Sequence, residues 1–109
     1  MSKKTWNKLV RDKIPEYLAL KDIKALTRVL AKKDYLVELR KKLTEEILEY
    51  FAAKKKKDRL EELADVLEVI YALAELDGCS PKELEKIRLE KADERGAFRD
   101  RVFLIETSE

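Results

Sequence analysis

The sequence predicts an all-α protein with a four-helix-bundle-like fold, assembled as an oligomer and ending in a short extended C-terminal arm. Glycine and proline number only two each, too few for a turn-rich β protein. Apolar residues recur at helical spacing along two long segments. Charged residues make up 44% of the chain, mostly Lys, Glu and Arg, which favour helices. With 109 residues, the chain is long enough for one domain, residues 1–109, with a modest core.

We expect the first part of the chain to form one short helix and one long helix. Pro15 suits the first turn of a short helix. A long helix is expected from about Asp34, as its N-cap, to about Ala53, followed by a solvated basic linker at residues 54–57. Its apolar stripe consists of Tyr35, Leu36, Leu39, Leu43, Ile47, Tyr50 and Phe51.

The next helix, expected from about Asp58 to Leu76, is apolar over most of its circumference. Only Glu61, Glu68 and Glu75 form a clean solvent-facing stripe. A helix that is apolar on most sides needs neighbours on most sides, and one small monomer supplies too few. We therefore expect a homodimer or a higher oligomer.

The boundary between this helix and the last one carries clear signals. Gly78 suits a left-handed C-cap. Ser80 then suits an N-cap and Pro81 the first helical position, while Glu83 completes a capping box. The last helix is expected to continue to about Arg95.

Two short segments, residues 27–30 and 101–105, have the composition of extended chain. The second could form a short strand or an extended arm, and the two could pair. Because these are the only β candidates, they do not change the predicted fold class.

Composition excludes several classes of function. Lys plus Arg (25) and Asp plus Glu (23) nearly cancel, so no charge excess draws the chain to a nucleic acid polymer or a membrane surface. No apolar run is long enough to span a membrane, the N-terminus lacks a signal-peptide core, and one cysteine cannot form an internal disulfide. These features predict a cytoplasmic protein. The absence of histidine excludes Ser–His and Cys–His catalysis and histidine-based zinc sites.

The strongest chemical signal is two pairs of carboxylates on neighbouring helices. Within each pair the residues are three apart and share a helical face. The pairs are Glu46 with Glu49, and Glu62 with Asp65. If the helices pack antiparallel, four carboxylates converge, and a hard cation such as Mg²⁺ would relieve their repulsion and desolvation.

Helical geometry distinguishes these acids from their neighbours. Glu62 and Asp65 lie on an otherwise apolar face, where solvation is a poor explanation for a charge. Glu45 is expected to point toward solvent or to support the ligands. The competing interpretation is that the acids are solvated, or ion-paired with Lys42 or Arg40. A carboxylate di-iron bundle ranks low because that class usually needs a Glu-x-x-His motif.

The acids and two flanking segments match a family pattern. The acidic motif is Glu45-Glu46-x-x-Glu49 followed by Glu62-x-x-Asp65. It resembles the signature of the all-α nucleoside triphosphate pyrophosphohydrolases, the MazG-like group that includes phosphoribosyl-ATP pyrophosphohydrolase. Residues 7–15 resemble the opening of a phosphoribosyl-ATP pyrophosphohydrolase-like subgroup, and residues 91–98 resemble the closing Lys/Arg-Gly-Phe segment. Ala97 departs from the second glycine expected there.

The resemblance implies a MazG-type helical bundle that dimerises or tetramerises. It implies Mg²⁺, or Mn²⁺ as a substitute, held by four catalytic carboxylates: Glu46, Glu49, Glu62 and Asp65. It also implies cleavage of a nucleoside triphosphate to a monophosphate and pyrophosphate, with nucleotide-pool clean-up as the expected role. The alternatives are phosphoribosyl-ATP hydrolysis in histidine biosynthesis and a non-enzymatic helical interaction module.

Two basic groups are candidates for binding the substrate's phosphates. Lys91 and Arg95 are four residues apart and share a helical face. The second group consists of Lys8, Arg11 and Lys13. Arginine suits bidentate phosphate contacts and lysine suits point-charge contacts. Without the resemblance, each group would be interpreted as solvated surface.

Overall fold

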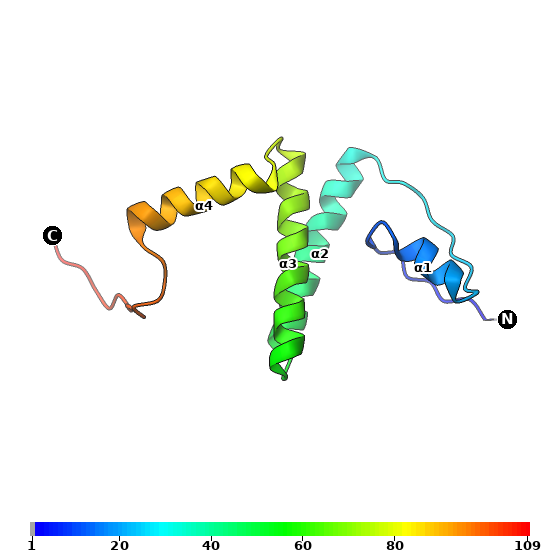
Figure 1. The fold of residues 1–109 in the computed structure, drawn as a ribbon, viewed down its shortest axis with the longest axis horizontal. Helices are drawn as coiled ribbons and strands as arrows, with labels where there is room; N and C mark the ends of the chain where they lie inside the picture. The colour runs from blue at the N-terminus through cyan, green and yellow to red at the C-terminus, as the bar shows by residue number, and fades with distance from the viewer. Residues whose placement is uncertain (1) are drawn as a thin grey trace.

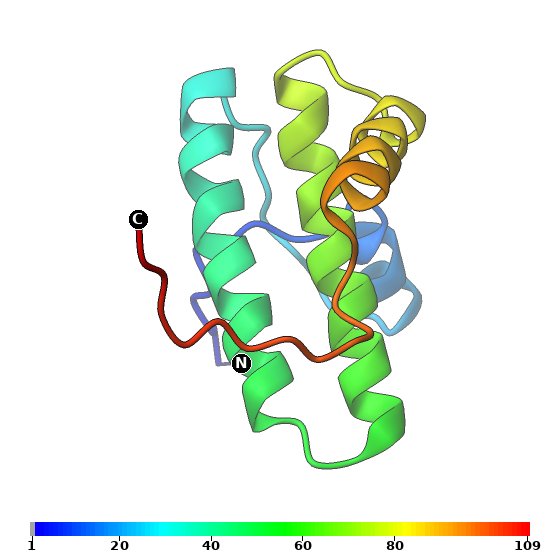
Figure 2. The ribbon, with the colours of Figure 1, turned by 90° about the vertical axis from the view of Figure 1, so that its left-hand side faces the viewer.

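The computed structural model describes residues 2–109 and contains four helices. They are α1 (Ile14–Leu20), α2 (Lys32–Ala52), α3 (Lys56–Leu76) and α4 (Pro81–Arg95) (Figure 1). The all-α prediction is confirmed. Residues 2–109 include no strand, so the predicted pairing of residues 27–30 with residues 101–105 is wrong. The chain after Arg95 instead runs as an irregular arm (Figure 2).

The centre of the fold is the antiparallel hairpin of α2 and α3 (Figure 2). Apolar side chains on the facing sides of the two helices meet here, and Leu39 and Val69 are the buried hydrophobic residues of the described chain. Because the turn between the helices is short, the two long helices lie alongside each other over most of their length. This packing fixes which side chains of α2 face those of α3.

The start of α2 differs from the sequence prediction. Asp34 is not the N-cap: Ala31 takes that position, without a side-chain cap, and Asp34 lies in the first turn. There its negative charge still interacts favourably with the exposed N–H groups of the helix N-terminus. The helix begins three residues earlier, nearly one turn, and Lys32 and Lys33 are good helix formers that suit its first positions.

The end of α3 has the predicted left-handed glycine. Gly78 has a φ of 75°, and its N–H donates to the Glu75 carbonyl at 3.0 Å. The N–H of Cys79 donates to the Ala74 carbonyl at 3.0 Å, which completes a Schellman motif. A side chain other than glycine would be strained at this φ.

The start of α4 confirms Ser80 as the N-cap and Pro81 at the first helical position, whereas the Glu83 carboxylate bonds the Ser80 hydroxyl and not the Ser80 N–H that a capping box uses. The Ser80 hydroxyl accepts a hydrogen bond from the Glu83 N–H at 3.1 Å, and the Glu83 carboxylate lies 3.0 Å from the same hydroxyl. This cap follows directly on the Schellman turn, and α4 then extends away from the hairpin (Figure 1).

The chain is extended for its length. Its radius of gyration is 18.6 Å, with extents of 67 × 35 × 24 Å, whereas a compact domain of about 100 residues has a radius of roughly 13 Å. In Figure 1, α4 and α1 project to opposite sides of the hairpin. Large apolar side chains such as Leu67, Ile87 and Phe103 are therefore exposed.

No helix in the described part of the chain is long and apolar enough to cross a membrane. The cytoplasmic location expected from the sequence stays a prediction.

Candidate metal and phosphate site

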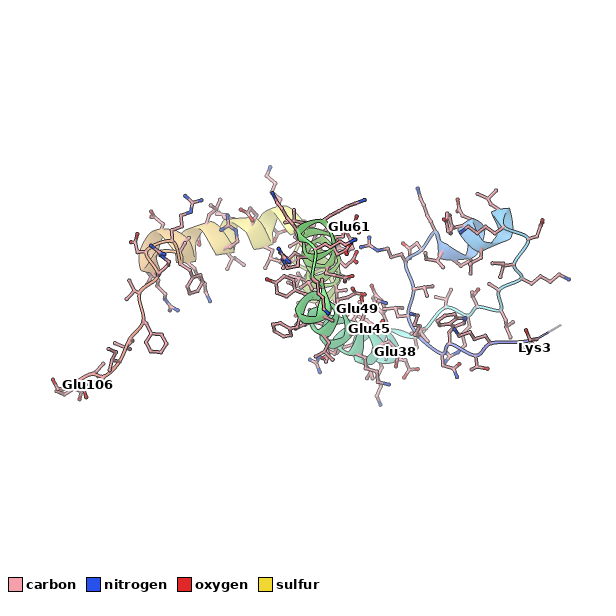
Figure 3. All side chains as sticks on the ribbon, turned by 90° about the horizontal axis from the view of Figure 1, so that it is seen from below. Lys3, Glu38, Glu45, Glu49, Glu61 and Glu106 are labelled. Carbon is pink, nitrogen blue, oxygen red and sulfur yellow. The ribbon has the colours of Figure 1, made fainter. Side chains whose placement is uncertain are left out.

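The α2–α3 hairpin brings the predicted carboxylates together. Glu46 on α2 and Glu62 and Asp65 on α3 each place a carboxylate oxygen within 4.8 Å of the other two. Glu45, Glu46 and Glu49 form a second such group along α2. Glu46 belongs to both groups and is therefore the centre of one continuous cluster, which we call the acidic cluster. The labelled Glu45 and Glu49 in Figure 3 lie on the side of α2 and α3 that faces the N-terminal segment.

The acidic cluster contains oxygens that the protein leaves without hydrogen bonds. Glu46 is only 6% exposed, and Glu62 and Asp65 are half-buried. One carboxylate oxygen of Glu46 and one of Glu62 are buried without a hydrogen-bond partner among the described residues. Such orphaned acceptors are costly and rare in proteins. Oxygens of this kind, on carboxylates from two helices, fit a hard divalent cation.

The electrostatics of the cluster disfavour full ionisation. Loss of hydration, followed by hydrogen bonds from its protonated form to Glu46 and Glu49, raises the pKa of Glu62 to about 7. Loss of hydration also raises the pKa of Glu49, and the nearby negative charge of Glu46 adds to this effect. A proton on Glu62 therefore relieves part of the repulsion among these carboxylates.

Three cations of the chain lie against the cluster. Lys42 Nζ is 3.5 Å from Glu45 Oε1 and 3.4 Å from Glu46 Oε1. The other two come from the segment before α1: Lys8 Nζ is 3.8 Å from Glu45 Oε1, and Arg11 Nη2 is 2.6 Å from Asp65 Oδ1. Glu46 therefore forms the ion pair with Lys42 that the competing interpretation of the sequence expected. Asp65 is also ion-paired, but its partner is Arg11.

Lys42, which the sequence analysis named only as a possible ion-pair partner of the acids, lies at the site although it is not among the predicted site residues. Its spacing, three residues before Glu45 and four before Glu46, is the helical ion-pair spacing and is the signal that identifies it. Its side chain is 20% exposed, so its charge acts in a partly dehydrated environment. Glu45, expected to support the ligands or face solvent, is half-buried and contacts both lysines.

The predicted phosphate-binding residues divide into two sets. Lys8 and Arg11 lie at the acidic cluster, and Lys13 is exposed at the start of α1. Lys91 and Arg95 lie on the far half of α4, which extends away from the hairpin (Figure 1). Within one chain, the structure does not bring these two residues to the carboxylates.

Of the two aromatic residues considered for base stacking, Trp6 is the one near the site. It is 60% exposed, and Lys4 and Lys8 lie over its ring at 4.0 and 5.1 Å from the centroid. Tyr71 is half-buried on α3, as expected for a packing residue.

The raised pKa of Glu62 predicts how stability depends on pH without a metal. Its pKa lies above the ordinary value of 4.5, so the folded chain binds more protons than the unfolded chain between about pH 4.5 and 7. Stability therefore falls as the pH rises through this window. Thermal melts in chelator from pH 4.5 to 8 measure it, and Glu62→Gln should flatten the slope. An unchanged slope in this variant would contradict the assignment.

The fold is all-helical, and the donor set of its acidic cluster fits a divalent cation. A family model described as phosphoribosyl-ATP pyrophosphohydrolase matches residues 7–92. The chain belongs to this family, within the MazG-like all-α nucleoside triphosphate pyrophosphohydrolase superfamily. Membership supports a pyrophosphohydrolase activity, and the family is generally dependent on a divalent metal. No curated protein and no solved structure matches the chain.

Proposed function

We propose that this protein is a Mg²⁺-dependent nucleoside triphosphate pyrophosphohydrolase that releases a monophosphate and pyrophosphate and removes unwanted nucleotides from the pool. The acidic cluster centred on buried Glu46 carries this proposal, because its buried oxygens without hydrogen-bond partners fit a divalent cation and the chain belongs to a pyrophosphohydrolase family. The second candidate substrate is phosphoribosyl-ATP, which the description of the family favours.

The proposed ligands of the cation are Glu46, Glu49, Glu62 and Asp65, and Mn²⁺ can substitute for Mg²⁺. When bound there, the cation offsets the charge of a triphosphate and lowers the pKa of coordinated water. Lys42 Nζ lies 3.4 Å from Glu46 Oε1, so its positive charge compensates part of the negative charge of the cluster.

The chain's own groups supply the remaining functions. An attack of water on the α-phosphorus needs a proton acceptor, and this role falls to a carboxylate of the cluster, either one of the four acids or Glu45 beside them. Lys8 and Arg11, which pair with Glu45 and Asp65, supply positive charge beside the cluster that suits contact with phosphate oxygens. Trp6, in the same segment, can stack on a base.

Product analysis tests the reaction class. The protein is incubated with Mg²⁺ and a panel of ribo-, deoxyribo- and modified nucleoside triphosphates, together with phosphoribosyl-ATP. We expect monophosphate and pyrophosphate, both lost when a chelator is added. Preference for phosphoribosyl-ATP would select the second candidate. No turnover, with no stabilisation by Mg²⁺, would instead favour a non-enzymatic interaction module.

We also propose that residues 1–109 form one domain that works as a homo-oligomer. Leu60, Leu63 and Leu67 form an apolar strip along α3 and are 56%, 46% and 45% exposed. The extended shape of the chain leaves α4 without packing beyond its start. In an oligomer, Lys91 and Arg95 could serve the acidic cluster of another copy, which they do not reach in their own chain.

Substituting the apolar strip tests this assembly. Leu63→Asp places a charge in the surface that a second copy would bury, so we expect a lower molar mass by size-exclusion chromatography with light scattering. Leu26→Asp is the control, because Leu26 is fully exposed in a segment without regular structure. A parent protein that is monomeric at all concentrations would contradict the proposal.

A further inference from the structure

The ion pair between Arg11 and Asp65 has a consequence for the order in which ligands bind. Arg11 Nη2 lies 2.6 Å from Asp65 Oδ1, close to where a cation held by Asp65 would lie. A guanidinium stays protonated at any physiological pH, so it cannot relieve the conflict with a cation by losing its proton. It can only move away.

The segment that carries Arg11 is held to the hairpin in a way that permits this movement. Two ion pairs tie it to the acidic cluster, Arg11 with Asp65 on α3 and Lys8 with Glu45 on α2. All four of these side chains are more than a third exposed, so each pair is weak. Among the described elements, α1 packs against none of the other helices, so the helix that follows Arg11 does not anchor this segment to the hairpin.

We propose that Arg11 is an exchangeable counter-ion of Asp65, a role that rests on the proposed metal site. Without a metal, its charge compensates the carboxylate. A divalent cation displaces it, and the released guanidinium is then available to a phosphate of the substrate. Cation and nucleotide therefore bind in order, and Arg11 takes part in both steps, first as the counter-ion of Asp65 and then as a contact of a substrate phosphate.

Metal titration without any nucleotide tests the exchange. The probe is Mn²⁺, with free Mn²⁺ followed by electron paramagnetic resonance. Arg11→Gln removes the competing charge, so its Mn²⁺ dissociation constant should fall by about two- to fivefold, the range expected for an exposed ion pair. Arg11→Lys, which keeps the charge, should return the affinity toward the parental value. Arg28→Gln is the control, because Arg28 is exposed in the segment between α1 and α2 and lies in none of the ion pairs found in the described chain.

The single tryptophan supplies a second readout in the same segment. Trp6 stacks with Lys4 and Lys8, so its fluorescence anisotropy reports how firmly the segment is held. Adding Mg²⁺ should lower the anisotropy of the parent protein. In Arg11→Gln the anisotropy should be low from the start and should not respond.

The outcomes separate this inference from the proposed function. Mn²⁺ binding that is equal or weaker in Arg11→Gln than in the parent would overturn the exchange while leaving the metal site in place. An anisotropy that Mg²⁺ does not change in the parent, despite Mn²⁺ binding, would also overturn it. Absence of Mn²⁺ binding in every variant would overturn the metal site itself, and the exchange with it.

Discussion

Replacing Glu46 with glutamine is expected to remove metal-dependent turnover, with a loss of at least about a hundredfold. Glu46 joins the two carboxylate groups of the cluster and is its only buried member. Glutamine keeps the shape but lacks the charge that offsets the cost of dehydrating a cation. Helix content by circular dichroism should stay unchanged, because the substitution removes a buried charge without creating a cavity. Steady-state release of pyrophosphate measures the loss.

The matched control for this variant is Glu68→Gln. Glu68 is an exposed residue of α3 outside the acidic cluster, so its loss of charge should leave turnover within about twofold of the parental rate. Asp65→Asn should behave like the Glu46 variant. Parental turnover in either cluster variant would show that the metal site is assigned to the wrong residues.

The second large effect is stabilisation by the metal. A cation that binds only the folded chain stabilises it by about 2.7 kcal/mol when its concentration is a hundred times Kd. For a domain of this size each kcal/mol raises Tm by roughly 4–8 °C, so Mg²⁺ should raise Tm by roughly 10 °C or more. Thermal melts with increasing Mg²⁺ at pH 8 measure this shift.

Glu62→Gln separates stabilisation by metal from a general effect of salt. Removing this charge relieves repulsion with Glu46 and Glu49, so the metal-free variant should melt higher than the parent at pH 8. Its response to Mg²⁺ should be lost. Equal responses in variant and parent would mean that Mg²⁺ acts elsewhere on the chain.

Local signals in the sequence determined much of the fold. The Schellman turn at Gly78 and the cap at Ser80 depend on residues only three to five positions apart, so their geometry is predictable from the chain itself. The predicted N-cap of α2 was wrong because an acid near the start of a helix suits either the N-cap or the first turn, and Asp34 lies in the first turn. The convergence of the carboxylates needed one further assumption, that the two long helices pack antiparallel.

The rest of the site depends on contacts between distant positions. Arg11 and Asp65 are 54 residues apart, and no periodicity links the two. The helical spacing between Lys42 and Glu46 predicts their ion pair. Lysine–glutamate pairs are so common on exposed helices, however, that the spacing alone does not identify a functional site. The local pattern of the preceding turn does not predict which helices α4 packs against, and in the structure α4 contacts α3 alone among the described helices and extends away from the hairpin, which separates Lys91 from the carboxylates.

The most direct test of the proposed activity is hydrolysis of a nucleoside triphosphate in ¹⁸O-labelled water with Mg²⁺, with the products analysed by mass spectrometry. Attack on the α-phosphorus predicts one ¹⁸O atom in the monophosphate and none in pyrophosphate, and no products in the presence of a chelator. Label in pyrophosphate, release of orthophosphate with a diphosphate, or turnover that persists in chelator would contradict the account.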